Sequence, residues 1–149
     1  MGKYWNASHS RYTLKYHFVW SVKYRRKILA GRERSEYLQE VLQEVGERYW
    51  FEFDTVGTDG DHVHVFVGAA PRYAPAEIAK IIKSITAREM FRRFPEIRKQ
   101  LWGGELWEDG YLVRSVGDEV TEEVIREYIK RQGQESHHAP FEQMMLFAF

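Results

Sequence analysis

Hydrophobic and polar positions alternate along residues 12–21, the pattern of a β-strand with two different faces. One face carries four large apolar side chains: Leu14, Tyr16, Phe18 and Trp20. The other face is more polar and includes Lys15 and His17. Apolar residues then return at helical spacing from Leu38 to Val45, and Ser35 is predicted to cap that helix.

The next segment predicts a hairpin followed by a second helix. Residues 50–58 and 62–67 are predicted strands, separated by the turn signal of Asp59, Gly60 and Asp61. Isoleucines at helical spacing between residues 78 and 85 mark the buried stripe of a long helix. We expect this helix to have Pro75 in its first turn and to stop before Pro95.

The last third of the chain predicts one more strand and one more helix. The strand covers residues 111–116, and the helix is predicted to be capped by Thr121 and ended by Gly133. The resulting order is that of an α+β fold, a ferredoxin-like or RRM-like βαββαβ antiparallel sheet with an added C-terminal helix. We expect one domain over residues 1–149, with a core at about 12–133 and a tail at 134–149.

Composition narrows the class of protein. The 149 residues are 44% hydrophobic and 15% aromatic, which suits a single packed core. We find no apolar run long enough to cross a bilayer and no signal peptide, so we expect a soluble, cytoplasmic protein with no membrane partner. The absence of cysteine excludes disulfides and thiolate metal sites. Any metal must therefore be bound by nitrogen or oxygen ligands.

Charge is balanced overall but locally clustered. The chain has 22 Lys plus Arg against 22 Asp plus Glu, which is not typical of proteins that grip long duplexes. Local basic patches matter more than this sum. The candidates for contacts with DNA phosphates are Lys23, Arg25, Arg26, Lys83 and Arg88. A second interpretation, in which these runs are solvated faces, stays open.

The candidate chemistry lies in His62-Val63-His64 and in the last helix. Side chains two apart in a strand share a face, so His62 and His64 can converge on one metal ion. Tyr128 and Gln132 are four residues apart and therefore neighbours on one helix face. Two histidines and a Gln oxygen would leave positions open for phosphate oxygens, which suits Mg²⁺ or Mn²⁺ better than a closed zinc site.

The pattern alone leaves plainer interpretations open. The two histidines would also suit an exposed strand face, and Tyr128 would suit the core of an amphipathic helix. Histidine-triad nucleotide hydrolases need a third alternate histidine, and Phe66 stands in that place. Asp61 either orients a metal-binding histidine through a hydrogen bond or shapes the turn, and we favour the turn.

Several short motifs in a fixed order make the chain, from about Tyr12 to Gln132, resemble the small single-tyrosine HUH transposases of insertion sequences, the TnpA-like family. The motifs are Lys23-Tyr24-Arg25-Arg26, Asp61-His62-Val63-His64, Tyr73-Ala74-Pro75 leading to Lys83-Ser84, Leu101-Trp102-Gly103, Leu106-Trp107, Gly110-Tyr111, Val116-Gly117, and Tyr128-Ile129 with Gln132. The order and spacing of these motifs carry the resemblance, since each is short.

The resemblance implies a DNA transposase that cuts and rejoins single-stranded DNA through a covalent 5′-phosphotyrosine. Tyr128 matches the nucleophile, His62 and His64 match the metal-binding histidines, and Gln132 matches the residue that completes the metal site. The implied cofactor is Mg²⁺ or Mn²⁺. The implied partners are DNA hairpins near the element's ends and a second subunit in a homodimer with composite active sites.

Three rival functions stay open at this point. A domesticated HUH nuclease would share the chemistry without mobility. A ferredoxin-like nucleic-acid-binding module would bind without metal and form no covalent adduct. A structural dimer would carry His62 and His64 without using them.

Overall fold

The fold is built on a four-stranded antiparallel sheet of strand order β4-β5-β3-β6. The computed structural model describes residues 5–7, 10–12, 15–117 and 119–132. The four strands are β3 (Lys15–Ser21), β4 (Glu52–Thr58), β5 (His62–Gly68) and β6 (Leu112–Val116). The long helices are α1 (Arg32–Tyr49), α2 (Pro75–Arg93) and α4 (Glu119–Lys130). Element order and sheet topology confirm the α+β, ferredoxin-like prediction.

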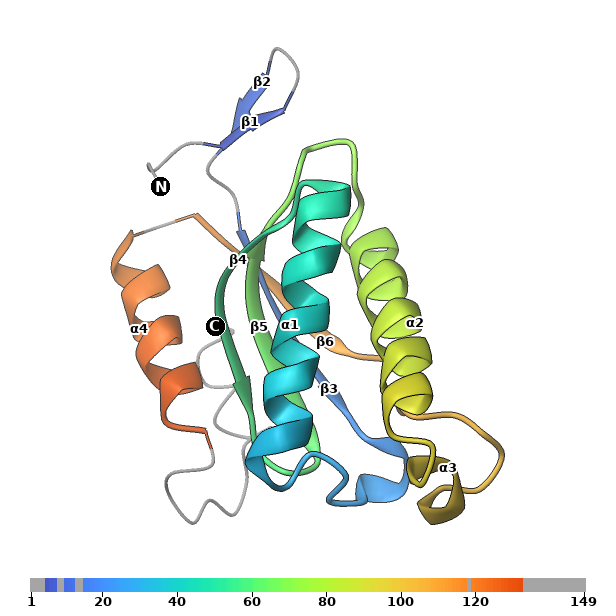
Figure 1. Ribbon diagram of the computed structural model, residues 1–149. Coiled ribbons are helices and arrows are strands. Elements are labelled where there is room, and N and C mark those ends of the chain that lie inside the picture. Colours follow the sequence, from blue (N-terminus) through green and yellow to red (C-terminus); the bar gives the residue numbers. More distant parts are fainter. Residues whose placement is uncertain (1–4, 8–9, 13–14, 118, 133–149) are drawn as a thin grey trace.

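Smaller elements flank this framework. A separate two-stranded sheet pairs β1 (Trp5–Ala7) with β2 (Ser10–Tyr12), which the alternation pattern does not predict. The short helices are the 3₁₀ turn η1 (Lys23–Arg25) and α3 (Ile97–Gln100). Figure 1 shows α1 and α2 side by side on one face of the sheet, with α4 standing apart from them. Within the described ranges, no helix is both long and apolar enough to span a membrane.

Both faces of the sheet are covered, which changes the environment of β5. Phe18 and Trp20 pack into the large core with α1 and α2, as their alternation predicts. Val19 and Phe66 pack on the opposite face, against α4. Every residue of β5 is consequently buried. The interpretation of the β5 histidines as polar residues on an exposed strand face is therefore wrong.

Two predicted helix starts are displaced. The first helix begins at Arg32, after Gly31 with φ +98°, and the Ser35 hydroxyl donates to the Gly31 and Arg32 carbonyls from within the first turn. Ser35 is thus not the cap, because its side chain bonds backwards along the helix. The last helix begins at Glu119, ahead of the predicted Thr121 cap. Pro75 starts α2 as predicted, while Gly133 and the tail 134–149 lie outside the described residues.

Candidate active site

The sheet places the two histidines of β5 in the layer beneath α4. His62 pairs with Ser21 of β3, and His64 pairs with Val19. Because they are two residues apart on one strand, both imidazoles point to the α4 side, with ring centroids 6.1 Å apart and planes tilted by 22°. His62 is 3% exposed and His64 is fully buried. A strand and a helix together therefore enclose these two side chains.

Helix α4 brings the tyrosine onto the same spot. The Tyr128 ring meets the His64 ring edge-on, with centroids 5.7 Å apart. Gln132 follows one turn later, and its Nε2 lies 3.3 Å from the Tyr128 carbonyl oxygen, to which it donates. Both side chains are buried. The structure thus brings together, within one chain, the four residues that the sequence singles out for chemistry.

The close approach of α4 depends on Gly57 of β4. A Cβ placed on Gly57 would lie 2.6 Å from the Ile129 carbonyl oxygen and 2.7 Å from the Ile129 Cγ2. Neither contact is possible for real atoms without a shift of the helix backbone. Gly57 pairs with His64 across the sheet, so the missing side chain lies beside the proposed metal ligand. The glycine is needed for close packing rather than for an unusual φ angle.

A partly buried ion-pair network ties α4 to β4 and β3, three residues before Ile129. Arg126 donates to both carboxylate oxygens of Asp54 on β4, at 2.8 and 2.9 Å. Lys15 of β3 donates to the same carboxylate at 2.9 Å. Burial alone would raise the pKa of Asp54, but hydrogen bonds from Arg126 and Lys15 outweigh it and hold that pKa well below its usual range. No local sequence pattern indicates this pairing, because Asp54 and Arg126 are distant along the chain.

Replacing Gly57 by alanine should displace α4 and Tyr128 with it. The added methyl group must move backbone, so we expect a loss of roughly 1–3 kcal/mol in the free energy of unfolding. A displacement of about 1 Å at the reacting group would lower cleavage about 100-fold. Urea unfolding and DNA cleavage rates measure the two effects. Val124→Ala is the contrasting variant, since Val124 lies on the exposed side of the same helix, with 42% of its surface accessible. Wild-type cleavage by Gly57→Ala would contradict this account.

The His62 ring lies between the carboxylate of Asp61 and the guanidinium of Arg25. The Asp61 carboxylate lies against Nδ1 of His62, and Arg25 Nη1 lies 3.4 Å from Nε2. The carboxylate at Nδ1 suits the tautomer with its proton on Nδ1 and its lone pair on Nε2. Asp61 also shapes the turn, since its backbone N–H donates to the Asp59 carbonyl. The carboxylate thus contacts His62 as well as shaping the turn, and its role in orienting a metal-binding histidine stays a prediction.

A third histidine joins the cluster from the neighbouring strand. The His17 ring of β3 lies 5.9 Å from the His64 ring, centroid to centroid, and is fully buried. Burial lowers the pKa of His64 well below its usual value, with smaller effects from His17 and His62. No described residue offers a hydrogen-bond partner to either ring nitrogen of His17 or His64. Sequence alternation puts His17 on the polar face, but only the strand register shows that it neighbours His64.

The side chains around His62 and His64 include one further candidate metal ligand. Among the described residues, no three His, Cys, Asp or Glu side chains are grouped as a metal site. Within the described ranges, a third ligand beside His62 and His64 would therefore be of another type. The amide oxygen Oε1 of Gln132 is buried and has no hydrogen-bond partner within the described part of the chain. Two imidazoles and one amide oxygen fit a divalent ion with open coordination positions.

The proposed nucleophile is protonated at neutral pH. Burial raises the pKa of Tyr128, and a side-chain hydrogen bond with Gln132 partly offsets this. The phenol must therefore lose its proton during the reaction rather than before it. Gln132, four positions along the same helix, thus neighbours Tyr128 and also stabilises its phenolate form.

The predicted phosphate contacts are spread over different surfaces. Arg25 reaches His62, and Arg26, the next residue, is exposed to solvent. Lys23 forms an ion pair of 3.1 Å with Glu105. Arg88 lies on α2, 3.6 Å from Glu89, and α2 covers the sheet face opposite α4. All four assignments to DNA stay predictions, and the geometry favours Arg25 and Arg26.

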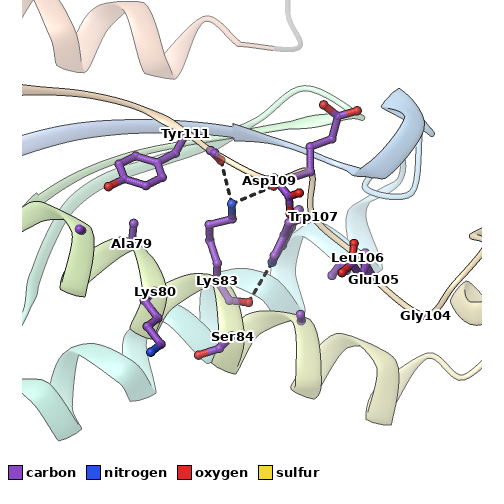
Figure 2. Close-up of a pocket in the computed structure, with 14 residues that line it drawn as sticks. Ala79, Lys80, Lys83, Ser84, Gly104, Glu105, Leu106, Trp107, Asp109 and Tyr111 are labelled. Carbon is purple, nitrogen blue, oxygen red and sulfur yellow. Dashed lines mark hydrogen bonds between the residues drawn. The ribbon is translucent and has the colours of Figure 1, made fainter.

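Lys83 holds a loop in place. Figure 2 shows its ammonium group directed at the chain between Trp107 and Tyr111. Nζ donates to the Glu108 carbonyl at 2.8 Å and to the Gly110 carbonyl at 2.7 Å. Burial lowers the pKa of Lys83. Two of its three N–H groups therefore bind backbone, and its contact with phosphate stays a prediction.

Comparison with known proteins assigns the chain to a family. The family described as "Transposase IS200 like" matches residues 10–132. The chain belongs to the IS200-like transposases. This transposase is 36% identical over 121 residues to the ISDra2 transposase TnpA of Deinococcus radiodurans, covering 81% of this chain and 85% of that protein. It is 26% identical over 137 residues to the transposase for insertion sequence element IS200 of Salmonella typhimurium, covering 91% and 87%.

Solved structures agree with the family assignment. A transposase crystal structure from Deinococcus radiodurans superposes on this IS200-like transposase with a TM-score of 0.67 and 32% identity, covering 85% of this chain and 95% of the other. A REP-associated tyrosine transposase bound to a REP hairpin has a TM-score of 0.58, covering 85% and 72%. Its 14% identity supports the shared fold alone. Membership in a transposase family implies an enzyme that cuts DNA.

Proposed function

We propose that this IS200-like transposase cuts and rejoins single-stranded DNA at insertion-sequence ends through a covalent bond between Tyr128 and a 5′ phosphate. The observation that carries this proposal is the edge-on contact of the Tyr128 and His64 rings, 5.7 Å between centroids. A phenol thus lies beside His64, one of the two histidines whose lone pairs would bind a metal ion. A core tyrosine with no catalytic role would not need this neighbour.

In the proposed reaction, one phosphorus–oxygen bond forms as another breaks, and the number of protons is unchanged. The Tyr128 oxygen attacks the phosphorus, the bond from phosphorus to the 3′ oxygen breaks, and the phenolic proton is balanced by the proton of the new 3′-OH. The linkage is a phosphodiester before and after, so a different 3′-OH can reverse the step and join a new strand. The transposase therefore needs no nucleotide cofactor, and the sequence contains no glycine-rich phosphate loop of usual spacing.

The residues of the site have separate tasks. We assign His62, His64 and Gln132 to a divalent ion, Mg²⁺ or Mn²⁺, which when bound draws charge from the phosphate oxygens and favours departure of the 3′ oxygen. Asp61 keeps the proton of His62 on Nδ1. Arg25, at 3.4 Å from His62, is placed to contact the same phosphate.

The test is formation of a covalent adduct. The transposase is incubated with single-stranded DNA from the ends of its own element, with Mg²⁺, with Mn²⁺ or with EDTA, and the products are separated on a denaturing gel. We expect a slowly migrating protein–DNA species with either metal, none with EDTA, and none with the same sequence as duplex. Tight binding of single strands without an adduct under any condition would instead indicate the non-catalytic binding module.

A homodimer with composite active sites stays part of the proposal. The structure describes one chain, in which α4 covers the histidines of its own sheet. Exchange of α4 between two subunits would need the contacts at Gly57 and Asp54 to be made by the partner instead. Mixing two inactive variants, one lacking Tyr128 and one lacking His64, would report such exchange through restored adduct formation.

A further inference from the structure

A shallow groove lies between the basic run after β3 and the short helix α3. Its volume is about 360 Å³, and its lining residues are Arg26, Lys27, Ile28, Lys99, Gln100 and Trp102. Three of these six side chains are positively charged, and none is negatively charged. The whole chain has no net charge, so this concentration of cations is local. A groove of this composition attracts anions.

Trp102 forms an exposed aromatic wall of the groove. Its side chain is 77% exposed, whereas the preceding Leu101 is buried in the core. Gly103 and Gly104 follow with φ angles of +81° and +74°, so the chain turns away immediately after the tryptophan. A buried anchor on one side and a tight turn on the other hold the indole at the surface. Its flat face is available for stacking.

Arg34 of α1 ties the two walls of the groove together. Its Nη1 donates to the Ile28 carbonyl at 3.2 Å and to Gln100 Oε1 at 3.3 Å. Its Nη2 donates to Glu96 at 3.2 Å. One guanidinium thus braces the basic segment against α3. The groove is therefore held open in advance, which reduces the entropic cost of binding.

The groove adjoins the candidate active site. Lys27 Nζ lies 4.0 Å from a carboxylate oxygen of Asp61, next to His62. Arg25 precedes the groove residue Arg26 and reaches Nε2 of His62 at 3.4 Å. Figure 1 shows the segment after β3 and α3 together at the end of the sheet where β3 finishes. A strand that passes from the histidines along Arg25 and Lys27 would reach this groove.

We infer that this groove binds a single-stranded DNA segment beside the cleaved bond, with a base stacked on Trp102 and phosphates against Arg26, Lys27 and Lys99. Base stacking on aromatic side chains beside a cationic track is how proteins hold single strands without reading their sequence. The location beside the cleaved bond rests on the proposed function, whereas the binding itself does not.

A second pocket fits this role less well. It has a volume of about 530 Å³, lies between α2 and the loop before β6, and includes the ring of Tyr111. Its lining contains Glu105, Glu108 and Asp109, which would repel phosphate. Lys83, one of the two lysines in its lining, already binds two backbone carbonyls. The charge of the two pockets therefore favours the Trp102 groove.

The experiment measures binding without cleavage. Fluorescence anisotropy follows a labelled thymidine homopolymer, an abasic homopolymer of equal length and a duplex, all in EDTA and in the Tyr128→Phe background. Trp102→Ala should weaken thymidine binding roughly five- to 100-fold. Replacing Arg26 and Lys99 by glutamine should flatten the slope of log affinity against log salt concentration by about 0.7 for each phosphate that is no longer neutralised. Trp50→Ala is the matched control, because Trp50 is also exposed but ends α1.

The abasic probe separates stacking from charge. The protein with Trp102 intact should bind the abasic homopolymer about as weakly as Trp102→Ala binds thymidine, and Trp102→Ala should not distinguish the two probes. Equal thymidine affinity with and without Trp102 would overturn the inference. Equal weakening of duplex binding by Trp102→Ala would also overturn it, by indicating a backbone contact without stacking. Since the binding experiment requires no cleavage, failure of the adduct test would not affect a positive binding result. Likewise, failure of the binding test would not affect a positive adduct result.

Discussion

Replacing Tyr128 by phenylalanine should abolish adduct formation and strand cleavage while leaving the fold intact. The phenol oxygen is the only heavy atom removed, and no other group in the proposed scheme can form the phosphotyrosine bond. Loss of a nucleophile lowers turnover by about 10⁴-fold or more. The ring packs against His64 and within the small core under α4, and phenylalanine preserves those contacts. Gel analysis of adducts and urea unfolding measure the two parts of the prediction.

The matched control is Tyr111→Phe. Tyr111 is 39% exposed and lies before β6, beside Lys83 rather than beside the histidines. This variant should form adducts at the wild-type rate. An adduct that persists in Tyr128→Phe would mean that another side chain is the nucleophile. Absence of the adduct in both variants would indicate that DNA binding, not the chemistry, had been disturbed.

Mild acid should destabilise the metal-free protein through its buried histidines. Burial, with a smaller effect of Arg114, lowers the pKa of His17 to about 3. In the unfolded chain the pKa is near 6.5, so between these values the unfolded state binds more protons than the folded state. The free energy of unfolding therefore falls as the pH falls below about 6.5. The slope is about 1.4 kcal/mol per pH unit, or about 2 kcal/mol by pH 5.

This effect is large relative to a typical domain stability of about 5–15 kcal/mol. His64 acts in the same direction, because burial lowers its pKa as well. Urea unfolding at several pH values in EDTA measures the slope. His17→Phe keeps a ring of similar shape and removes the titrating group, so it should reduce the slope by about 1.4 kcal/mol per pH unit. The same slope in wild type and His17→Phe would show that His17 does not control the acid response.

The local pattern of the sequence is sufficient for the framework of the fold. Alternation along residues 15–21, the Asp-Gly turn before His62 and the isoleucine stripe of α2 each follow from backbone geometry within a few residues. Helix boundaries follow less directly, as Ser35 shows. A hydroxyl can cap a helix or bond back along it, and the preceding Gly31 decides between the two in the folded chain.

The candidate site divides in the same way. His62 and His64 share a face because strands have a period of two, and Tyr128 and Gln132 share a face because helices have a period near 3.6. Each pair can be named from spacing and family resemblance. Spacing does not show that the two pairs meet. The local sequence does not indicate which face of the sheet α4 packs against.

The sequence by itself determined the α+β class, the element order, the family resemblance and the two pairs of candidate residues. Tertiary structure alone decided what surrounds them: the burial of β5 on both faces, the place of His17 beside His64, the contact of Ile129 with Gly57 and the pairing of Arg126 with Asp54. The physical reason is distance along the chain. Periodicity reports which side of an element a residue faces, whereas contacts between remote elements depend on strand register and on the packing of whole helices.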